Sequence, residues 1–329
     1  LRKVKIDILN SNNSSTISKE ELYNLLLQKP NRKVFLNYRF YLRLYNLSNQ
    51  ERIDQKIIKK QTKTEKINSK IKQQNSSSLI SDSNYVQRPL KVRKLVFGER
   101  LQNAGEAPVI YSALKLNRTK EQLKKHLFNK GYFKSEITDS IFVLDNGQID
   151  IHYFIKLRNP MHLSSIKYYC PDILISNYLD SIQSNSFLKK EAIFDTDNLV
   201  KERNRINDFL TNNGFYNFNK EFIYFDIDTN YITNTVNITL GIQNYKKINQ
   251  INNSFQDLTH KQFKISKVNI QIGDSSKFKN ITKLDSIENS FFKIINYQPI
   301  NFKSKVFKNS IFFKKDDYYK KNVAQQTYR

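Results

Sequence analysis

The sequence predicts an α+β fold in which one small module recurs, with the order strand, helix, helix, strand, strand. Three observations predict it. An apolar strand phrase occurs three times, a helix ending in glycine and an aromatic pair occurs twice, and two alternating strands follow each such helix. We expect each module to form a three-stranded mixed sheet with two helices on one face.

The strand phrase places apolar residues at positions one, four and six. Its three copies are Leu1, Val4 and Ile6; Leu163, Ile166 and Tyr168; and Ile265, Val268 and Ile270. Such spacing also arises by chance, so its weight comes from the phrases that follow it. The chain enters this alternation directly at Leu1, without a secretory signal, and we expect a fragment of a longer protein.

The first helix of each module is predicted from its N-terminal cap. Ser18 begins a capping box before Leu22, Leu25 and Leu26, and Pro30 follows. In the second copy Asp172 caps a helix whose apolar residues are Tyr178, Leu179 and Ile182.

The second helix ends in the glycine phrase. Leu127–Phe133 (LFNKGYF) recurs as Leu210–Tyr216 (LTNNGFY). Gly131 and Gly214 stand where a helix ends in the left-handed conformation that glycine adopts most easily, so their backbone explains them without a ligand. A capping box at Thr119 predicts the start of the first copy. The buried faces are predicted to be Leu116, Leu123 and Leu127, and then Leu199, Ile206, Phe209 and Leu210.

A hairpin is predicted after each of these helices. The Asn146-Gly147 turn joins 141–144 to the alternating strand 149–155. In the second copy 222–227 pairs with 236–242 across a longer polar loop.

These elements divide the chain into modules. We expect a first module at 1–158, a second at 159–245, a polar linker at 246–262, and an incomplete third module at 263–329 that ends at the start of its second helix. The first module is stretched by a polar, basic segment at about 48–90, which we interpret as a flexible loop because no hydrophobic period is evident.

Five phrases in this order resemble the POTRA-bearing outer-membrane assembly factors of the BamA/TamA type, over nearly the whole chain. They are Gln28-Lys29-Pro30-Asn31; Gly105-Glu106-Ala107-Pro108-Val109; Asn129 to Phe133; Phe194-Asp195 with Leu199, Glu202, Arg203, Arg205 and Ile206; and Gly214 to Thr229. Their spacing is similar to the periplasmic part of a TamA-like member. The structural motif residues carried over are Gly105, Glu106, Pro108, Gly131, Gly214, Glu202 and Arg203, and we expect the last two to serve packing.

The resemblance implies a periplasmic arm at the bacterial outer membrane that binds unfolded outer-membrane proteins and accessory envelope assembly proteins. Such an arm adds a client strand to a sheet edge and passes the client to a C-terminal β-barrel. We find no succession of amphipathic strands that would form this barrel and expect it to be absent from this chain. The candidate edge strands are Ile141, Phe142, Val143 and Leu144, and Phe222, Ile223, Tyr224, Phe225, Asp226 and Ile227. We expect a proline at Tyr224 to weaken client binding.

Composition leaves other classes open. The 329 residues include 55 Lys and Arg against 30 Asp and Glu, a net charge of +25. This charge fits a nucleic-acid or anionic-membrane binder, although a chain rich in Lys, Asn and Ile also reflects an AT-rich genome. A purely structural spacer and, less favoured, a cationic nucleic-acid-binding protein remain alternatives. The essential insertase and a TamA-like paralogue are not distinguished.

Enzymatic chemistry is not predicted, and no cofactor or metal is expected. The four histidines, His126, His152, His162 and His260, have no metal-ligand spacing, and the glycines form no phosphate loop. Asp226 and Asp228 lack a partner base, and Cys170 is the one cysteine, so no internal disulfide forms. No apolar run reaches the roughly 20 residues that span a bilayer.

Overall fold

The computed structural model describes residues 1–9, 17–34, 38–81, 87–248, 255–272, 285–288, 292–296 and 309–327. The chain divides into two compact units. Unit 1 holds residues 1–126 and 135–158, and unit 2 holds residues 127–134 and 159–329. Within the described ranges no helix combines the length and apolar character needed to cross a membrane.

Unit 1 is built on a three-stranded sheet with the order β1-β3-β2. The middle strand β3 (Ile149–Lys156) pairs in parallel with β1 (Lys3–Leu9) and antiparallel with β2 (Glu136–Val143). The predicted turn at Gly147 joins β2 to β3, and the Gly147 amide donates to the Leu144 carbonyl at 2.8 Å. The α+β prediction with a mixed sheet is therefore confirmed.

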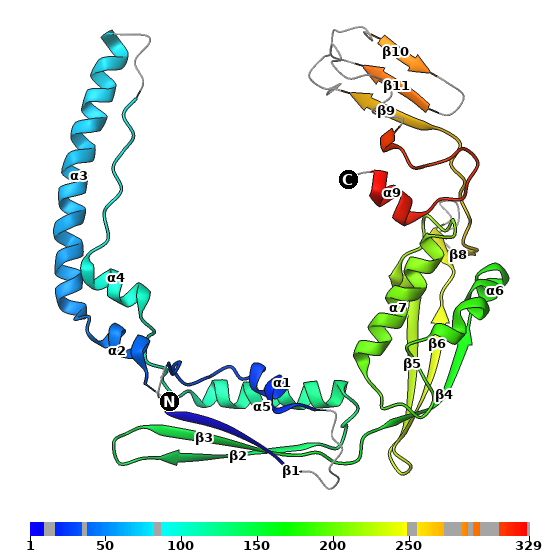
Figure 1. Cartoon of the computed structure of the whole chain (residues 1–329), viewed down its shortest axis with the longest axis horizontal. Helices are drawn as coiled ribbons and strands as arrows, with labels where there is room; N and C mark the ends of the chain where they lie inside the picture. Colours follow the sequence, from blue (N-terminus) through cyan, green and yellow to red (C-terminus); the bar gives the residue numbers. More distant parts are fainter. Residues whose placement is uncertain are drawn as a thin grey trace. The chain divides into compact units, whose positions relative to one another are not determined.

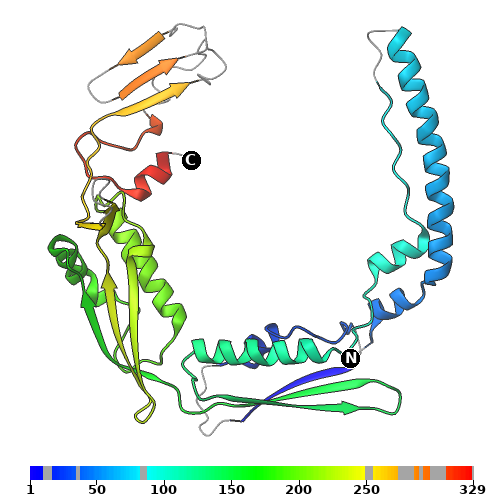
Figure 2. The same cartoon turned by 180° about the vertical axis from the view of Figure 1, so that it is seen from behind.

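Helices α1 (Lys19–Asn24) and α5 (Ala113–Asn129) cover one face of this sheet (Figures 1 and 2). The Ser18 hydroxyl accepts the Glu21 amide, so the predicted cap of α1 is confirmed. The core alternates along the strands and follows the helices at helical spacing; it includes Val4, Ile6, Leu22, Leu26, Leu116, Leu123, Ile151, Tyr153 and Ile155.

The predicted helix start at Thr119 is wrong. Helix α5 begins at Ala113, and Thr119 lies inside it, fully buried. Its hydroxyl donates to the Lys115 carbonyl and accepts the Leu27 amide at 3.3 Å. The residue that resembled a cap thus holds the end of α1 against α5.

The segment predicted to be a flexible loop at 48–90 is largely helical, so that prediction is wrong. Between short helices α2 (Phe40–Asn46) and α4 (Phe97–Ala104) runs α3 (Gln50–Ser81), 32 residues long. Ile53 and Ile57 are four residues apart, as are Ile67 and Ile71, and at about 100° per residue all four lie on its covered face. This sparse period was hidden among lysines and glutamines.

An extended segment, 87–96, returns along this face and lies beside α3 in both views (Figures 1 and 2). Asn68 pairs with both backbone groups of Lys91, at 2.8 and 2.9 Å, and Asn75 does the same with Arg88, at 3.0 Å. Seven helical residues rise about 10 Å, as do three extended residues, so the two asparagines match the segment's repeat. The helix therefore binds the returning segment through backbone groups, and such contacts leave no recognisable pattern in the sequence of that segment.

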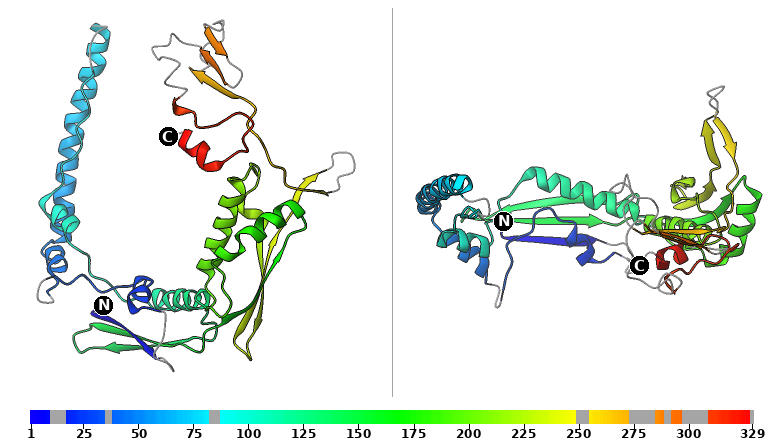
Figure 3. Two further views of the ribbon diagram at one scale, coloured as in Figure 1. Left: turned by 45° about the vertical axis from the view of Figure 1, so that its right-hand side comes forward. Right: turned by 90° about the horizontal axis from the view of Figure 1, so that it is seen from above.

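Unit 2 repeats the sheet plan with the order β4-β6-β5. The middle strand β6 (Thr235–Ile242) pairs in parallel with β4 (His162–Tyr169) and antiparallel with β5 (Ile223–Asn230). Helices α6 (Ile173–Ile182) and α7 (Thr196–Thr211) pack on one face (Figure 3). Asp172 caps α6, as predicted. The core includes Leu163, Ile175, Leu179, Leu199, Ile206, Leu210, Val236, Ile238 and Leu240.

The rest of unit 2 departs from the expected order. The segment predicted to be a polar linker holds an antiparallel pair, β7 (Tyr245–Ile248) and β8 (Phe255–Leu258). Strands β9 (Val268–Ile272), β10 (Asp285–Glu288) and β11 (Phe292–Asn296) form a sheet of order β10-β11-β9, and α9 (Lys321–Thr327) follows. Two strands thus stand where a helix was expected. The third module stays a prediction.

We predict that Asn68→Ala combined with Asn75→Ala will release the returning segment. Two hydrogen bonds are lost at each site, so local opening should become easier by about 2 kcal/mol and exchange of the Arg88 and Lys91 amides about thirtyfold faster. Hydrogen exchange measures this. Ser69→Ala is the control, because its hydroxyl bonds only to the Lys66 carbonyl of the same helix. Unchanged exchange at both amides would contradict the pairing.

Candidate functional site

Strand β2 is the outermost strand of the unit 1 sheet, on the side opposite β1. It holds three of the residues predicted to bind a client. Ile141, Phe142 and Val143 expose 41%, 49% and 72% of their surface. Consecutive strand residues point to opposite faces, so this end of β2 presents apolar side chains on both faces of the sheet.

The free backbone groups of β2 follow from its ladder. The Leu144 amide donates to the Gln148 carbonyl at 2.9 Å, so these two residues form a hydrogen-bonded pair. Such pairs alternate along an antiparallel ladder. Phe142 is therefore bonded to β3, whereas the N–H and C=O groups of Ile141 and Val143 face away from it. The outer edge carries the unpaired groups that another strand needs.

Strand β5 is the corresponding outer strand in unit 2. The Gln243 amide donates to the Phe222 carbonyl at 2.9 Å, so these two residues form a hydrogen-bonded pair. By the same alternation the backbone groups of Tyr224 bond to β6, whereas the N–H and C=O groups of Ile227 face away from β6. The Tyr224 ring covers Gly241 on β6, where a Cβ atom would overlap it. Tyr224 thus holds β5 to its neighbour, and Ile227 belongs to the edge.

Two predicted edge residues lie just outside the strands. Leu144 follows the last residue of β2, and Phe222 lies in the 3-10 turn η3 (Lys220–Phe222). The sequence also did not indicate that β1 and β4 form the opposite edges. The start of β4 is covered, because the Leu163 amide donates to the Ala192 carbonyl at 2.8 Å.

The phrases around Asn31 and Gly105 meet in unit 1. The Asn31 side chain donates to the Ala107 carbonyl at 2.7 Å and accepts the Val109 amide at 3.2 Å. The Glu106 carboxylate accepts the Arg32 amide at 2.9 Å. Gly105 ends α4 against the backbone of α2, where a Cβ atom would not fit, and Pro108 continues the extended chain. These contacts fix the base of the segment that runs from the start of α2 to the end of α4, residues 40–104, which we call the α2–α4 insertion.

Glu202 is fully buried in unit 2 and is held by several partners. Its carboxylate pairs with the Arg205 guanidinium at 2.6 Å and accepts the Phe187 amide at 3.0 Å and the Tyr168 hydroxyl at 3.4 Å. The carboxylate raises the pKa of Arg205. Arg205 also donates to the Ile182 carbonyl at 3.0 Å. The group joins α7 to β4 and to the turn after α6.

Arg203, the neighbour of Glu202, has a different environment. Its guanidinium lies over the Phe225 ring, 5.2 Å from the centroid. Phe225 belongs to the edge strand β5. Arg203 therefore contacts the candidate edge through a cation–π interaction, which the sequence did not indicate.

Gly131 and Gly214 both have positive φ, of 88° and 94°, as the helix-end prediction requires. Each glycine carbonyl accepts an amide from a residue two positions before the next copy of the strand phrase, Met161 for Gly131 and Phe263 for Gly214, at 2.8 Å. A further amide, of Phe194 or Tyr319 respectively, donates to that residue's carbonyl at 2.8 Å. The repeated phrase thus has a repeated set of backbone partners, and these glycines serve the fold.

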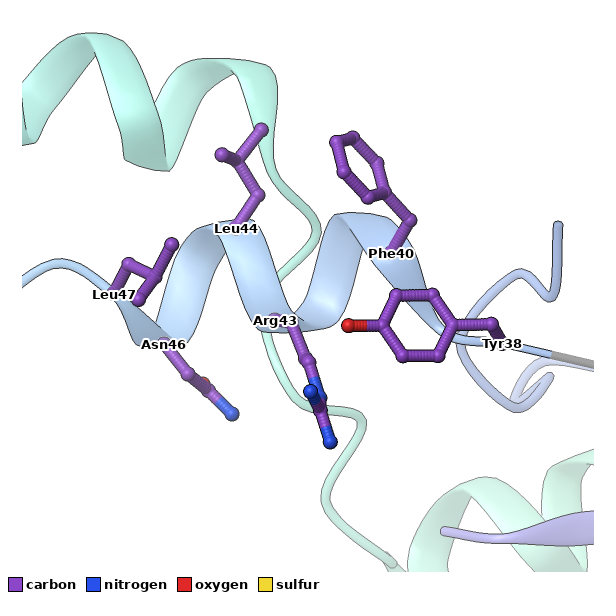
Figure 4. A pocket seen from close by; sticks show the side chains of 6 residues that line it. All are labelled: Tyr38, Phe40, Arg43, Leu44, Asn46 and Leu47. Carbon is purple, nitrogen blue, oxygen red and sulfur yellow. The ribbon is translucent and has the colours of Figure 1, made fainter.

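A surface hollow of about 470 Å³ lies on α2. Figure 4 shows Phe40 and Leu44 on one side of the helix and Arg43 and Asn46 on the other. The Arg43 guanidinium lies 4.9 Å from the centre of the Tyr38 ring. The lining holds no carboxylate, histidine or cysteine, so it provides no acid–base pair.

The titratable residues considered for chemistry lie apart. Among the described residues, no group of three or more His, Cys, Asp or Glu could hold a metal ion. Burial raises the pKa of the Cys170 thiol to about 11, which disfavours the nucleophilic thiolate. The histidines have separate surroundings: His126 is beside Glu21, His152 between Phe142 and Phe154, His162 against Glu191, and His260 between Phe218 and Phe222.

One protein-family model matches the N-terminal part of the chain. The model described as POTRA, surface antigen variable number repeat, matches residues 4–158. Residues 4–158 are a POTRA domain. The POTRA match thus spans the α2–α4 insertion. No curated protein matches the sequence of the chain.

Solved structures of POTRA domains are also similar to this chain. The third to fifth POTRA domains of BamA from Haemophilus influenzae cover 68% of this chain and 70% of theirs, at 11% identity and a TM-score of 0.36. The match to the first two POTRA domains of the periplasmic domain of Omp85 from Anabaena covers 73% of this chain and 92% of that one, at 8% identity and a TM-score of 0.28. The match to BamA from Haemophilus ducreyi lacking its first three POTRA domains covers 44% of this chain and 26% of that one, at 16% identity and a TM-score of 0.28.

We predict that Glu202→Ala will lower the free energy of unfolding of unit 2 by about 3 kcal/mol, because it leaves a partly buried guanidinium and an amide without their acceptor. Urea unfolding followed by circular dichroism measures the change. Glu221→Ala, at an exposed position, is the control and should change stability by less than about 0.5 kcal/mol. Equal stability of the two variants would contradict the structural role of Glu202.

Proposed function

We propose that this chain is the periplasmic arm of an outer-membrane protein assembly or translocation factor, and that it binds extended client or partner chains at the β2 and β5 edges. The POTRA match supports the class of protein, and the similar structures include one described as the periplasmic domain of Omp85. The single observation that carries the binding mode is the row of unpaired backbone groups at Ile141 and Val143, beside exposed apolar side chains.

The chemistry of such an edge suits many clients. Backbone hydrogen bonds to a sheet edge depend little on the sequence of the added strand, whereas side-chain contacts select alternate positions. An unfolded outer-membrane protein offers strands with alternating apolar and polar residues. On β2 the exposed Ile141 and Val143 share a face, so they can contact the apolar positions of the added strand. The role is binding, not catalysis.

We also propose the module boundaries. Unit 1 ends at Arg158, where the POTRA match also ends, which supports a first module at 1–158. The repeated strand order in β4, β6 and β5 supports a second POTRA-like module at 159–245. We place the chain at the periplasmic face of the outer membrane, with accessory assembly proteins as further partners.

We predict that Ile141→Pro and Ile227→Pro each weaken client binding while the sheets stay folded. Proline removes an amide that faces outward, so the ladders to β3 and β6 keep their hydrogen bonds. The probe is a fluorescein-labelled peptide of about ten residues with alternating aromatic and polar positions, as in a barrel strand. Fluorescence anisotropy should show at least about a tenfold loss of affinity, equivalent to one or two hydrogen bonds.

Ile141→Thr and Ile227→Thr are the matched controls, because threonine keeps both the amide and a β-branched side chain. Tyr224 is not suitable for the proline test proposed from sequence, because its amide belongs to the ladder and its ring covers Gly241. Circular dichroism checks that the variants are folded. Unchanged affinity of both folded proline variants would exclude edge binding, and no affinity in the unsubstituted chain would favour a structural spacer.

A further inference from the structure

Six of the eight basic residues of α3 gather on one side of the helix, whereas Lys60 lies at the border of this side and Lys72 on the opposite side. At about 100° per residue, the six fall within an arc of about 80° and extend over about 27 Å of the axis. We call this set the basic stripe; it consists of Arg52, Lys56, Lys59, Lys63, Lys66 and Lys70. The three acidic residues of α3, Glu51, Asp54 and Glu65, lie on the other side. The sequence did not indicate this stripe, because the segment was predicted to be a loop and not a helix.

Within the part of the chain that the structure describes, the side chains of the basic stripe have no ion-pair partner. All six side chains are exposed, and no salt bridge in the described ranges involves any of them. Lys60, on the border of the stripe, is different, because its ammonium group donates to the Lys94 and Leu95 carbonyls. The six cations are neighbours at spacings of three and four residues, where like charges destabilise a helix. An external anion would relieve this repulsion.

The apolar side of α3 is already covered. Ile53 and Ile71 are buried, and Asn68 and Asn75 hold the returning segment over that side. The side that remains open is therefore charged instead of amphipathic. Such a surface binds through electrostatic attraction and does not need to insert into an apolar phase.

We propose that the basic stripe docks the chain on a bilayer surface that carries anionic lipid head groups. All six cations lie on one side of a straight helix, so they can contact a flat surface at the same time. The phosphate backbone of a nucleic-acid duplex curves away from such a straight row of charges. Five of the six are lysines, which act as point charges, and α3 has no aromatic residue on which bases would stack. Charge complementarity with a lipid surface is thus the best match. The proposal does not depend on the client-binding edges.

The test uses the whole chain and sucrose-loaded vesicles of phosphatidylcholine with about one third phosphatidylglycerol, in a co-sedimentation assay. Binding is expected to these vesicles and not to pure phosphatidylcholine, and it should fall at least tenfold between about 0.05 M and 0.5 M salt. Equal binding to both kinds of vesicle, or binding without salt dependence, would overturn the proposal without any substitution.

The decisive variant replaces Lys56, Lys59, Lys63 and Lys66 with glutamine, which preserves helix propensity. The control replaces Lys115, Lys124, Lys125 and Lys201, also exposed and helical, so both proteins lose four charges. We expect about a hundredfold weaker vesicle binding for the stripe variant and less than about threefold for the control. Equal effects would overturn the proposal. So would stripe-dependent binding of duplex DNA without vesicle binding, which would identify a nucleic-acid partner.

Discussion

The parallel pairing of β1 with β3, and of β4 with β6, is the contact on which the other features depend. A parallel pair cannot be closed by a tight turn, so the chain between the two strands must cross a face of the sheet, and here it does so as two helices. The hairpin that completes each sheet then places β2 or β5 on the outside. The same crossover accommodates the whole α2–α4 insertion, because loop closure becomes only slowly more costly with length.

The sequence predicted this plan where the signal is local and repeated. The caps at Ser18 and Asp172, the Asn146-Gly147 turn and the glycines at helix ends are short phrases with one physical reading each. It failed where the partner is distant or is backbone. Thr119 resembled a cap, and Asn68 and Asn75 resembled loop residues, because nothing local shows that they bind the Leu27 amide and the returning segment.

The candidate edges illustrate the same limit. Alternation located the strands at Ile141 and Ile227, but which amides face outward depends on register, and register became visible only through the bonds at Leu144 and Gln243. The net charge of +25 also changes meaning. Counted along the sequence this charge is diffuse, whereas six of the basic residues form the basic stripe on α3, a surface that is distinct from the β2 and β5 edges.

The central claim, that an added strand pairs with the β2 edge, is tested most directly by amide hydrogen exchange with and without an excess of the barrel-strand peptide. Strand addition predicts slower exchange at Ile141 and Val143, whose amides face outward, with little change at Phe142, which is already bonded to β3. This alternating pattern would establish the binding mode. Peptide binding with no protection at Ile141 and Val143 would contradict it.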